Sequence, residues 1–526
     1  MALVASVTIH RPAKFISMVA DVTPAHVGQL SPDGRWRWDG AAWQPVAAPL
    51  PAWASTRTRW HATWVTLACA LVFGVVADQS LRTGTFGLAA SLALIVGAVT
   101  AVTAGRLQRI ESRLLVAAAA LFASWLTFRA SPWLLWPDLL VSVGLLGLAA
   151  SLAVRGSVSD LGVTELVARG FHAAVQLAAG PGFVARPAIA SRGRLGVAAP
   201  LLRGAVIALP VAAVLAALLA SADPVFASFF KLDVDLGTLT LDVFFVAAGS
   251  WCAAGLLRLA ASEPLEDVGG PRWKLGATEA LVVLAVLDAV FAAFAVAQVL
   301  AATGAAAETL RNAGVTYSDY ARSGFFQLLW VSGITLGLLV LFGRVSNLAE
   351  PNTRRAFTVL ACCAIALILM IDVVAFRRLS LYEEAYGFTM LRLYSHVFAV
   401  WLGAVFVLLA ADFLGVRRNR RWFIGATMVT ALAVLLGLNV ANPEAVVVAL
   451  NTSHAQTSNR IDSEYLAELS SDATPALLES RAQIAPVLRQ QVTDAACAGA
   501  KAYAPAWGAF NVADDQAAAA RRAGCR

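Results

Sequence analysis

The sequence predicts an all-α polytopic membrane protein with about eleven transmembrane helices and a small extracytoplasmic helical C-terminal tail. Three observations predict this fold class. Hydrophobic residues make up 59% of the 526 residues and charged residues only 14%, against about 25% in soluble proteins. Apolar runs of about 18 residues or more, long enough to cross a bilayer, recur along most of the chain. Arg and Lys are more numerous in alternate connections between these runs, as the positive-inside rule expects.

The N-terminal region, residues 1–59, lacks the apolar core of a signal peptide, so we expect the first span to act as the insertion signal. It contains a short Trp-rich module, SPDGRWRWDGAAWQPV (31–46), which resembles a module near the N-termini of other bacterial membrane proteins. Two Asp-Gly pairs, at 33–34 and 39–40, are hairpin signals. Three tryptophans can stack across such a small sheet: Trp36, Trp38 and Trp43. We interpret the module as a cytoplasmic recognition or membrane-surface element, with a flexible linker as the alternative.

The transmembrane domain is predicted over residues 60–441. Its apolar runs are 60–77, 86–104, 112–128, 133–154, 201–221, 239–261, 276–302, 324–343, 354–376, 391–414 and 422–441. The longest connection, 155–200, is amphipathic and Arg-rich, and we expect it to lie on the inner leaflet. Gly333 and Gly337, four residues apart in the eighth run, would allow close helix packing.

The distribution of basic residues predicts the orientation. If the N-terminus is cytoplasmic, the inner connections hold 19 Arg and Lys residues and the outer connections hold eight. The C-terminus is then extracytoplasmic. Only four of the 40 basic residues are Lys, and such Arg- and Ala-rich usage is typical of a high-GC bacterial genome. The predicted location is therefore the bacterial cell (plasma) membrane, crossed many times.

A candidate polar site is formed by two outer connections, VTYSDYARSGFF (315–326) and RRLSLYEEAYGFTMLRLYSH (377–396). All seven tyrosines fall on the predicted outer side. The candidate residues are Tyr317, Asp319, Tyr320, Arg322, Arg378, Tyr382, Glu383, Glu384, Tyr386, Arg392 and His396.

These side chains offer two kinds of chemistry. Glu383, Glu384 and Asp319 would serve as acid, base or metal ligands. Arg378 and Arg392 would hold an anionic head group. The alternative is an interfacial helix whose tyrosines lie at the head-group level and whose charges pair with each other in water.

Acidic residues also occur inside the spans. Asp288 lies near the middle of the seventh run, where an ionised carboxylate costs about 2.5–3.5 kcal/mol, so we expect it to face the bundle, paired or protonated, with Gln298 above it. Four others lie toward the outer ends of their runs, and we interpret them as acids in ordinary interfacial water: Asp78, Asp138, Asp242 and Asp372.

The chain resembles two bacterial membrane families known as domains of unknown function 4153 and 4173. The resemblance covers roughly residues 200–515. Its motifs are TYSDYARSGFFQLLW (316–330), RRLSLYEEAYGFTMLRLY (377–394), NVANPEAVVVALN (439–451), DSEYLAELSSDATPALL (462–478) and WGAFN (507–511). The resemblance implies a multi-pass topology and candidate residues, but no reaction.

The tail, residues 442–526, is predicted to be a small helical cap. A helix is expected from Thr474-Pro475 to about Arg481, and another after Pro486. Cys497 and Cys525 could form a disulfide outside the cell, and the sequence leaves this open. The tail has more acids than bases, which argues against nucleic-acid binding.

No cofactor is predicted, and the cysteine and histidine spacings indicate no metal site. The predicted partners are the lipid bilayer and a small-molecule or lipid ligand, with no nucleic acid. Three functions follow: binding or moving an envelope component or small solute through an outward-facing polar site, a membrane-embedded transferase acting on a lipid-linked substrate, or a membrane sensor or scaffold.

Overall fold

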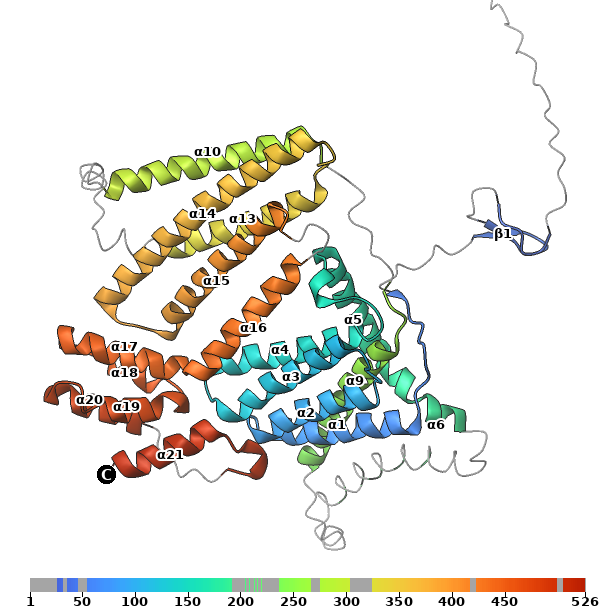
Figure 1. Ribbon diagram of the computed structural model, residues 1–526. Coiled ribbons are helices and arrows are strands. Elements are labelled where there is room, and N and C mark those ends of the chain that lie inside the picture. Colours follow the sequence, from blue (N-terminus) through green and yellow to red (C-terminus); the bar gives the residue numbers. More distant parts are fainter. Residues whose placement is uncertain are drawn as a thin grey trace, which may run out of the picture. The chain divides into compact units, whose positions relative to one another are not determined.

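The computed structural model of this protein divides the chain into two compact units, Met1–Pro51 and Ala52–Arg526. The structure describes residues 26–31, 36–45, 54–191, 236–265, 275–302, 324–416, 422–498 and 505–525, with helical backbone also at 204, 208, 212, 215 and 219. Figure 1 shows these segments in colour.

The first unit contains a two-stranded antiparallel sheet, β1 (Trp36–Trp38) and β2 (Trp43–Pro45). Its turn is closed by the carboxylate of Asp39, which accepts two backbone N–H groups, and by Gly40 at a φ of +106°. The rings of Trp38 and Trp43 lie 5.5 Å apart across the sheet. The hairpin predicted at residues 39–40 is confirmed, whereas the second Asp-Gly pair, 33–34, lies outside the described residues.

The second unit begins with a group of helices packed around α9. They are α1 (Trp64–Arg82), α2 (Leu88–Thr103), α3 (Ile110–Phe128), α4 (Pro132–Ser151), the 3₁₀ turn η2 (Val158–Asp160), α5 (Val163–Val184), α6 (Arg186–Ala190) and α9 (Leu236–Ala261). Glycines allow the closest approaches: a Cβ at Gly74 would collide with Ser250 of α9, and one at Gly180 would collide with Gly255. At Gly333 and Gly337 an added Cβ would meet nothing within 4 Å, so the close packing predicted there is wrong.

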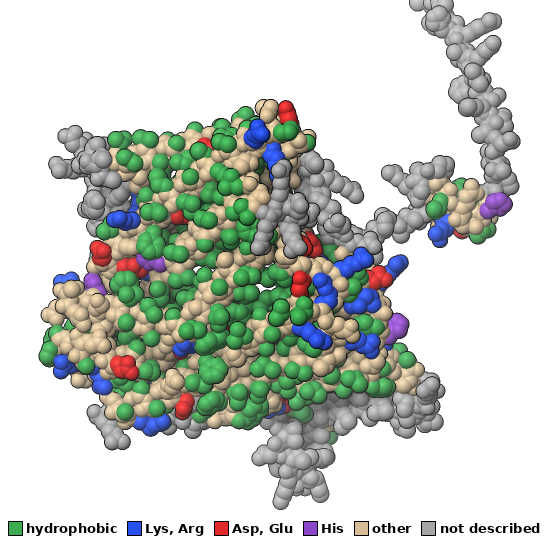
Figure 2. All heavy atoms as spheres, viewed as in Figure 1, with side chains coloured by type: hydrophobic (Ala, Val, Ile, Leu, Met, Phe, Trp, Pro, Cys, Tyr) green, Lys and Arg blue, Asp and Glu red, His purple; other side chains and the backbone are tan. Residues whose placement is uncertain are grey.

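A second group contains α10 (Ala277–Ala302), α13 (Phe325–Val345), α14 (Pro351–Tyr386) and α15 (Met390–Phe413). Their shared core is apolar, and its fully buried members include Leu284, Leu339, Phe357, Ile368 and Phe406. The helix α16 (Phe423–Ala441) packs against α15 of this group and against α4 and η2 of the first group. Figure 2 shows hydrophobic side chains spread over the outer faces of these helices, as a lipid-facing surface requires.

Helix starts follow local sequence signals. Thr63 accepts the backbone N–H of Thr66 and forms a capping box with it at the start of α1. Pro132 and Pro351 begin α4 and α14, where the missing N–H of proline costs nothing.

Nine of the described helices are long and apolar enough to cross a membrane, and α2 is a shorter apolar helix. The protein is therefore a multi-pass, all-α membrane protein. Ten of the eleven predicted runs coincide with described helices. The remaining run, 201–221, lies almost wholly outside the described residues, so the count of eleven stays a prediction.

The connection expected on the inner leaflet contains α5, which packs against α9. Its polar side chains are buried against neighbouring helices. Arg169 donates to Glu165 and Ser151, His172 lies 3.1 Å from Ser262 Oγ, and Gln176 accepts from Arg258. The amphipathic pattern thus reflects a polar helix–helix contact.

The tail is helical, as predicted. It contains α17 (Pro443–Ser458), α18 (Ser463–Ala467), η4 (Ser471–Ala473), α19 (Thr474–Ser480), α20 (Pro486–Cys497), η5 (Trp507–Ala509) and α21 (Val512–Gly524). The helices expected at Thr474 and Pro486 are confirmed, although Thr474 is the first helical residue and its hydroxyl accepts from Arg521. A disulfide joins Cys497 to Cys525. A small core of apolar residues lies between α17, α19 and α20.

Candidate functional site

The candidate site is built where α14 turns into α15. α14 runs past its apolar part and ends at Gly387, whose φ of +76° favours glycine. A Cβ there would lie 2.7 Å from Asn451 Oδ1 of α17. The Asn451 amide accepts the N–H of Phe388 and donates to its carbonyl, at 3.0 and 2.8 Å. The tail therefore holds the α14–α15 turn through Asn451, and the Tyr465 hydroxyl of α18 accepts the N–H of Met390 at the start of α15.

Three side chains converge between α14 and α15 just before this turn. Glu383 Oε1 lies 3.2 Å from His396 Nδ1, and these two side chains are only 4% and 15% exposed. The other ring nitrogen of His396, Nε2, lies 3.3 Å from the hydroxyl of Ser380. The sequence predicted Glu383 and His396 as site residues but missed Ser380.

The predicted arginines and tyrosines also meet here. Arg392 lies over the ring of Tyr382 at 4.3 Å and donates to the carbonyls of Tyr386 and Gly387 at the end of α14. The rings of Tyr382 and Tyr386 are 4.8 Å apart. In this arrangement Arg392 stabilises the helix end, where cations are favoured. The binding of a head group by Arg392 stays a prediction.

Arg378 and Gln298 link α14 to α10. Arg378 donates to Gln298 Oε1 at 3.3 Å, near the C-terminal end of α10. Asp288 lies ten residues earlier in α10 and is half-buried; neither of its carboxylate oxygens has a hydrogen-bond partner among the described residues. Its protonation or pairing stays a prediction. Four other predicted site residues, Tyr317, Asp319, Tyr320 and Arg322, lie outside the described residues.

The four acids that were predicted to lie in interfacial water are buried or half-buried between helices, so that interpretation is wrong. Asp78 and Asp242 both pair with Arg82. Asp372 accepts from Ser332 at 2.5 Å, and Asp138 accepts from Asn439 at 2.8 Å. Asp78, Asp138 and Asp372 are at most 6% exposed. Asp138, Asp242 and Asp372 receive their donors from a neighbouring helix, which the sequence of one helix does not reveal, whereas Asp78 pairs with Arg82 of its own helix.

A pocket of about 440 Å³ opens beside the α14–α15 turn. One wall is formed by that turn and the other by α17 and the start of α18. Its lining residues are Glu384, Tyr386, Gly387, Asn451, His454, Ser458, Arg460, Ile461 and Asp462. Two predicted residues, Glu384 and Tyr386, therefore face charged groups of the tail that the sequence did not single out. The pocket presents charges of both signs.

A second group of missed residues attaches the tail to the transmembrane helices. Asp472 accepts the backbone N–H groups of Ala130 and Ser131 at 2.7 and 2.8 Å and pairs with Arg129 at 3.3 Å. Arg129 also donates to the carbonyl of Asn439. Asn511 donates to the carbonyl of Arg129 at 2.8 Å.

These contacts explain the structural role of three sequence motifs that carry the family resemblance. Asn439, Asn451, Asp472 and Asn511 come from three motifs far apart in the sequence. All four bond to the connection after α3 or to the α14–α15 turn. Asn451, Asp472 and Asn511 of these motifs therefore attach the tail, whereas Asn439 lies in α16 and contacts the same Arg129 that pairs with Asp472.

Glu444 is buried at the start of α17 and accepts the N–H and hydroxyl of Ser470 at 2.8 and 2.7 Å. Burial raises the pKa of Glu444 above its usual value, although the Ser470 bonds oppose the shift. A carboxyl with a raised folded-state pKa binds more protons in the folded than in the unfolded tail. The contribution of Glu444 to the stability of the tail is therefore fully present below the ordinary Glu pKa of about 4.3 and is lost as pH rises through the raised value.

We expect Glu444→Gln, which keeps an oxygen acceptor for Ser470, to remove this part of the pH dependence. The unfolding free energy should change with pH by about 1.4 kcal/mol less in the variant for each unit by which the pKa of Glu444 is raised. Thermal unfolding of the purified protein between pH 4 and 8 measures it. Glu464→Gln changes an exposed carboxylate and should keep the wild-type pH dependence. An unchanged pH dependence in Glu444→Gln would contradict the prediction.

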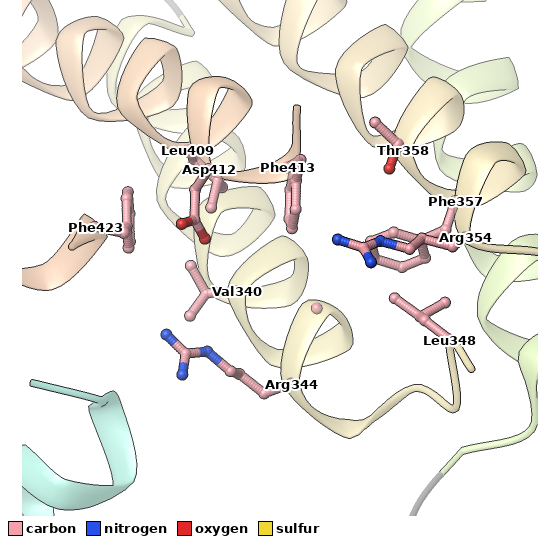
Figure 3. Close-up of a pocket in the computed structure, with 11 residues that line it drawn as sticks. Val340, Arg344, Leu348, Arg354, Phe357, Thr358, Leu409, Asp412, Phe413 and Phe423 are labelled. Carbon is pink, nitrogen blue, oxygen red and sulfur yellow. The ribbon is translucent and has the colours of Figure 1, made fainter. Parts of the chain in front are cut away.

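A second polar pocket, of about 300 Å³, lies at the other end of α14. Figure 3 shows Arg344, Arg354 and Asp412 pointing into the space between α13, α14 and α15, with aromatic rings around them. Arg354 and Glu384 are thirty residues apart on α14, or about 45 Å. The two pockets therefore lie on opposite sides of a hydrocarbon layer of about 30 Å.

Among the described residues, no three His, Cys, Asp or Glu side chains are grouped so as to hold a metal ion. No curated protein and no solved structure matches the chain. The family model for the domain of unknown function DUF4153 matches residues 116–480, which include the α14–α15 turn and the part of the tail that contains Asp472. Since this match covers more than half of the chain, the protein belongs to the DUF4153 family.

Proposed function

We propose that this membrane protein binds the polar part of an envelope component, or a small polar solute, in the pocket between the α14–α15 turn and the tail. The observation that carries the proposal is the lining of this pocket. Glu384 and Asp462 supply carboxylates, and Arg460 and His454 supply basic groups, within about 440 Å³. A ligand that carries both charges would pair with both sets.

A zwitterionic head group matches these charges. A guanidinium and an imidazole bind phosphate oxygens well, and carboxylates bind an ammonium group. Tyr386, 57% exposed, adds an aromatic face on which a cationic head group can rest. Phosphoethanolamine is the simplest probe with this chemistry.

The orientation of the pocket is part of the proposal. We infer that residues 1–59 are cytoplasmic, that 60–441 form the transmembrane domain and that 442–526 are extracytoplasmic. The excess of Arg and Lys in alternate connections supports this arrangement. The disulfide between Cys497 and Cys525 supports it independently, because disulfides persist in oxidising compartments outside the cytoplasm.

We expect purified protein in detergent to bind phosphoethanolamine and Arg460→Gln to weaken that binding by about 10- to 100-fold, because a charge-assisted hydrogen bond contributes about 1.5–3 kcal/mol. Isothermal titration calorimetry measures the affinity. Arg489→Gln removes an exposed guanidinium of α20 that does not line the pocket, and should bind as wild type does.

A competition experiment with nanodiscs distinguishes a lipid head group from a soluble solute as the ligand. If nanodiscs containing phosphatidylethanolamine suppress binding of free phosphoethanolamine, the natural ligand is a lipid head group. If they do not, it is a soluble solute. Equal affinity of wild type and Arg460→Gln for the free probe would refute the pocket.

A further inference from the structure

We propose that Ser380, His396 and Glu383 form an acyl-transfer centre at the membrane surface. This activity goes beyond head-group binding and does not depend on it, since none of the three residues lines the pocket described above. The distances are 3.3 Å from Ser380 Oγ to His396 Nε2 and 3.2 Å from His396 Nδ1 to Glu383 Oε1. A hydroxyl beside one imidazole nitrogen and a carboxylate beside the other is the arrangement that activates a serine.

The buried carboxylate determines the direction of proton transfer. Glu383 is 3% exposed, and its Oε1 lies 3.2 Å from Nδ1, although the two atoms do not have hydrogen-bond geometry. A carboxylate this close favours the tautomer with the proton on Nδ1. Nε2 is then an acceptor 3.3 Å from the Ser380 hydroxyl, which also lies 3.1 Å from the carbonyl of Phe376 and must rotate from that acceptor to give its proton to His396. The ring of Phe376 packs on His396 at 4.2 Å and fixes the plane of the imidazole. Glu383 acts as a positioning residue, and His396 acts as the base.

The depth of Ser380 indicates the substrate class. Between Arg355 and Arg377, α14 has 21 residues with Asp372 as the one charged side chain, which is about 32 Å of helix and matches the hydrocarbon thickness. Ser380 lies three residues, or about 5 Å, beyond Arg377. The polar layer of a bilayer is about 5–8 Å thick on each side. Ser380 is half-buried at this level, where the ester carbonyls of lipids lie.

The reaction is an ester exchange. Ser380 Oγ attacks the carbonyl carbon of a lipid acyl ester, and its proton passes to His396 Nε2. The bond to the alcohol oxygen breaks, and His396 returns the proton to that oxygen, so the alcohol leaves and the acyl group stays on Ser380. A second alcohol, or water, then gives its proton to His396 and accepts the acyl group, which restores the Ser380 hydroxyl. Arg377 lies one turn before Ser380 on the same side of α14, and we assign it to the developing oxyanion.

A fluorophosphonate probe tests this centre in the full-length protein in nanodiscs. We expect the probe to label wild type covalently, with the adduct located on Ser380 by peptide mass spectrometry. Ser380→Ala should lose the label. His396→Asn should slow labelling by at least about 100-fold, the usual contribution of a general base. Glu383→Gln should slow labelling by at least about tenfold, and Glu383→Asp should recover part of the rate, which a purely structural role would not predict.

Ser395→Ala is the matched control. Ser395 is buried, lies next to His396 and donates to a helix carbonyl as Ser380 does, but does not contact an imidazole among the described residues. It should be labelled at the wild-type rate, and thermal unfolding should show that every variant is folded. Absence of labelling in folded wild type, an adduct on another residue, or an unchanged rate in His396→Asn would each overturn the proposal. None of these outcomes bears on phosphoethanolamine binding, so the two proposals fail separately.

Discussion

Replacing Asp472 with alanine is expected to release the tail from the transmembrane helices and to lower its unfolding free energy by about 3–5 kcal/mol, the usual effect of breaking a buried ion pair. Asp472 is 4% exposed and satisfies Arg129 together with the N–H groups of Ala130 and Ser131. Alanine would leave a partly buried guanidinium and two backbone donors without this acceptor. Thermal unfolding and limited proteolysis of the tail measure the loss.

The control for this change is Asp494→Ala. Asp494 is an exposed acid of the same tail with one hydrogen bond to Gln490, so its loss should change stability by no more than about 0.5 kcal/mol. Equal stability of the two variants would contradict the role of Asp472. The functional consequence is also testable, because the tail supplies His454, Arg460 and Asp462 to the pocket. Asp472→Ala should therefore weaken phosphoethanolamine binding although the pocket itself is unchanged.

The sequence predicted the spans well because span formation depends on local composition. A run of about twenty apolar residues has one stable arrangement in a bilayer, whatever its neighbours are. The same locality explains why Thr474-Pro475 was recognised as a helix start. It also explains why the amphipathic pattern of α5 identified a polar face but did not show that α9 covers that face. The position of α5 on the inner leaflet stays a prediction.

The site could be predicted only in part, for the same reason. His396 and Glu383 were found because titratable residues are rare next to an apolar span. Ser380 was missed because a serine after two arginines is ordinary in sequence, and only the crossing of α14 and α15 brings it beside an imidazole. Asp472 and Arg129 are 343 residues apart. No pattern in one sequence pairs them, although the motif containing Asp472 was recognised as part of the family resemblance.

Cys497→Ser is expected to reduce the stability of the tail by about 3–4 kcal/mol. The disulfide joins residues 28 positions apart, and a loop of this length restricts the unfolded chain by about that free energy. Cys525 closes the end of α21 onto α20, next to the small core that contains Val492 and Ala496. Without the bond, α21 should separate first, and proteolysis should remove it. The reduced wild type should unfold at the same temperature as Cys497→Ser.

The same bond tests the orientation on which the proposed function depends. When cells are lysed in denaturant without reductant, a maleimide should label Cys69, Cys252, Cys362 and Cys363. It should label Cys497 and Cys525 only after reduction. Cys69→Ala is the control, because it removes a thiol of α1 that has no bonded partner and should leave the tail as stable as in wild type. If Cys497 and Cys525 were labelled in cells without reductant, the tail would lie in a reducing compartment. The pocket would then face the cytoplasm, and an envelope ligand could not reach it.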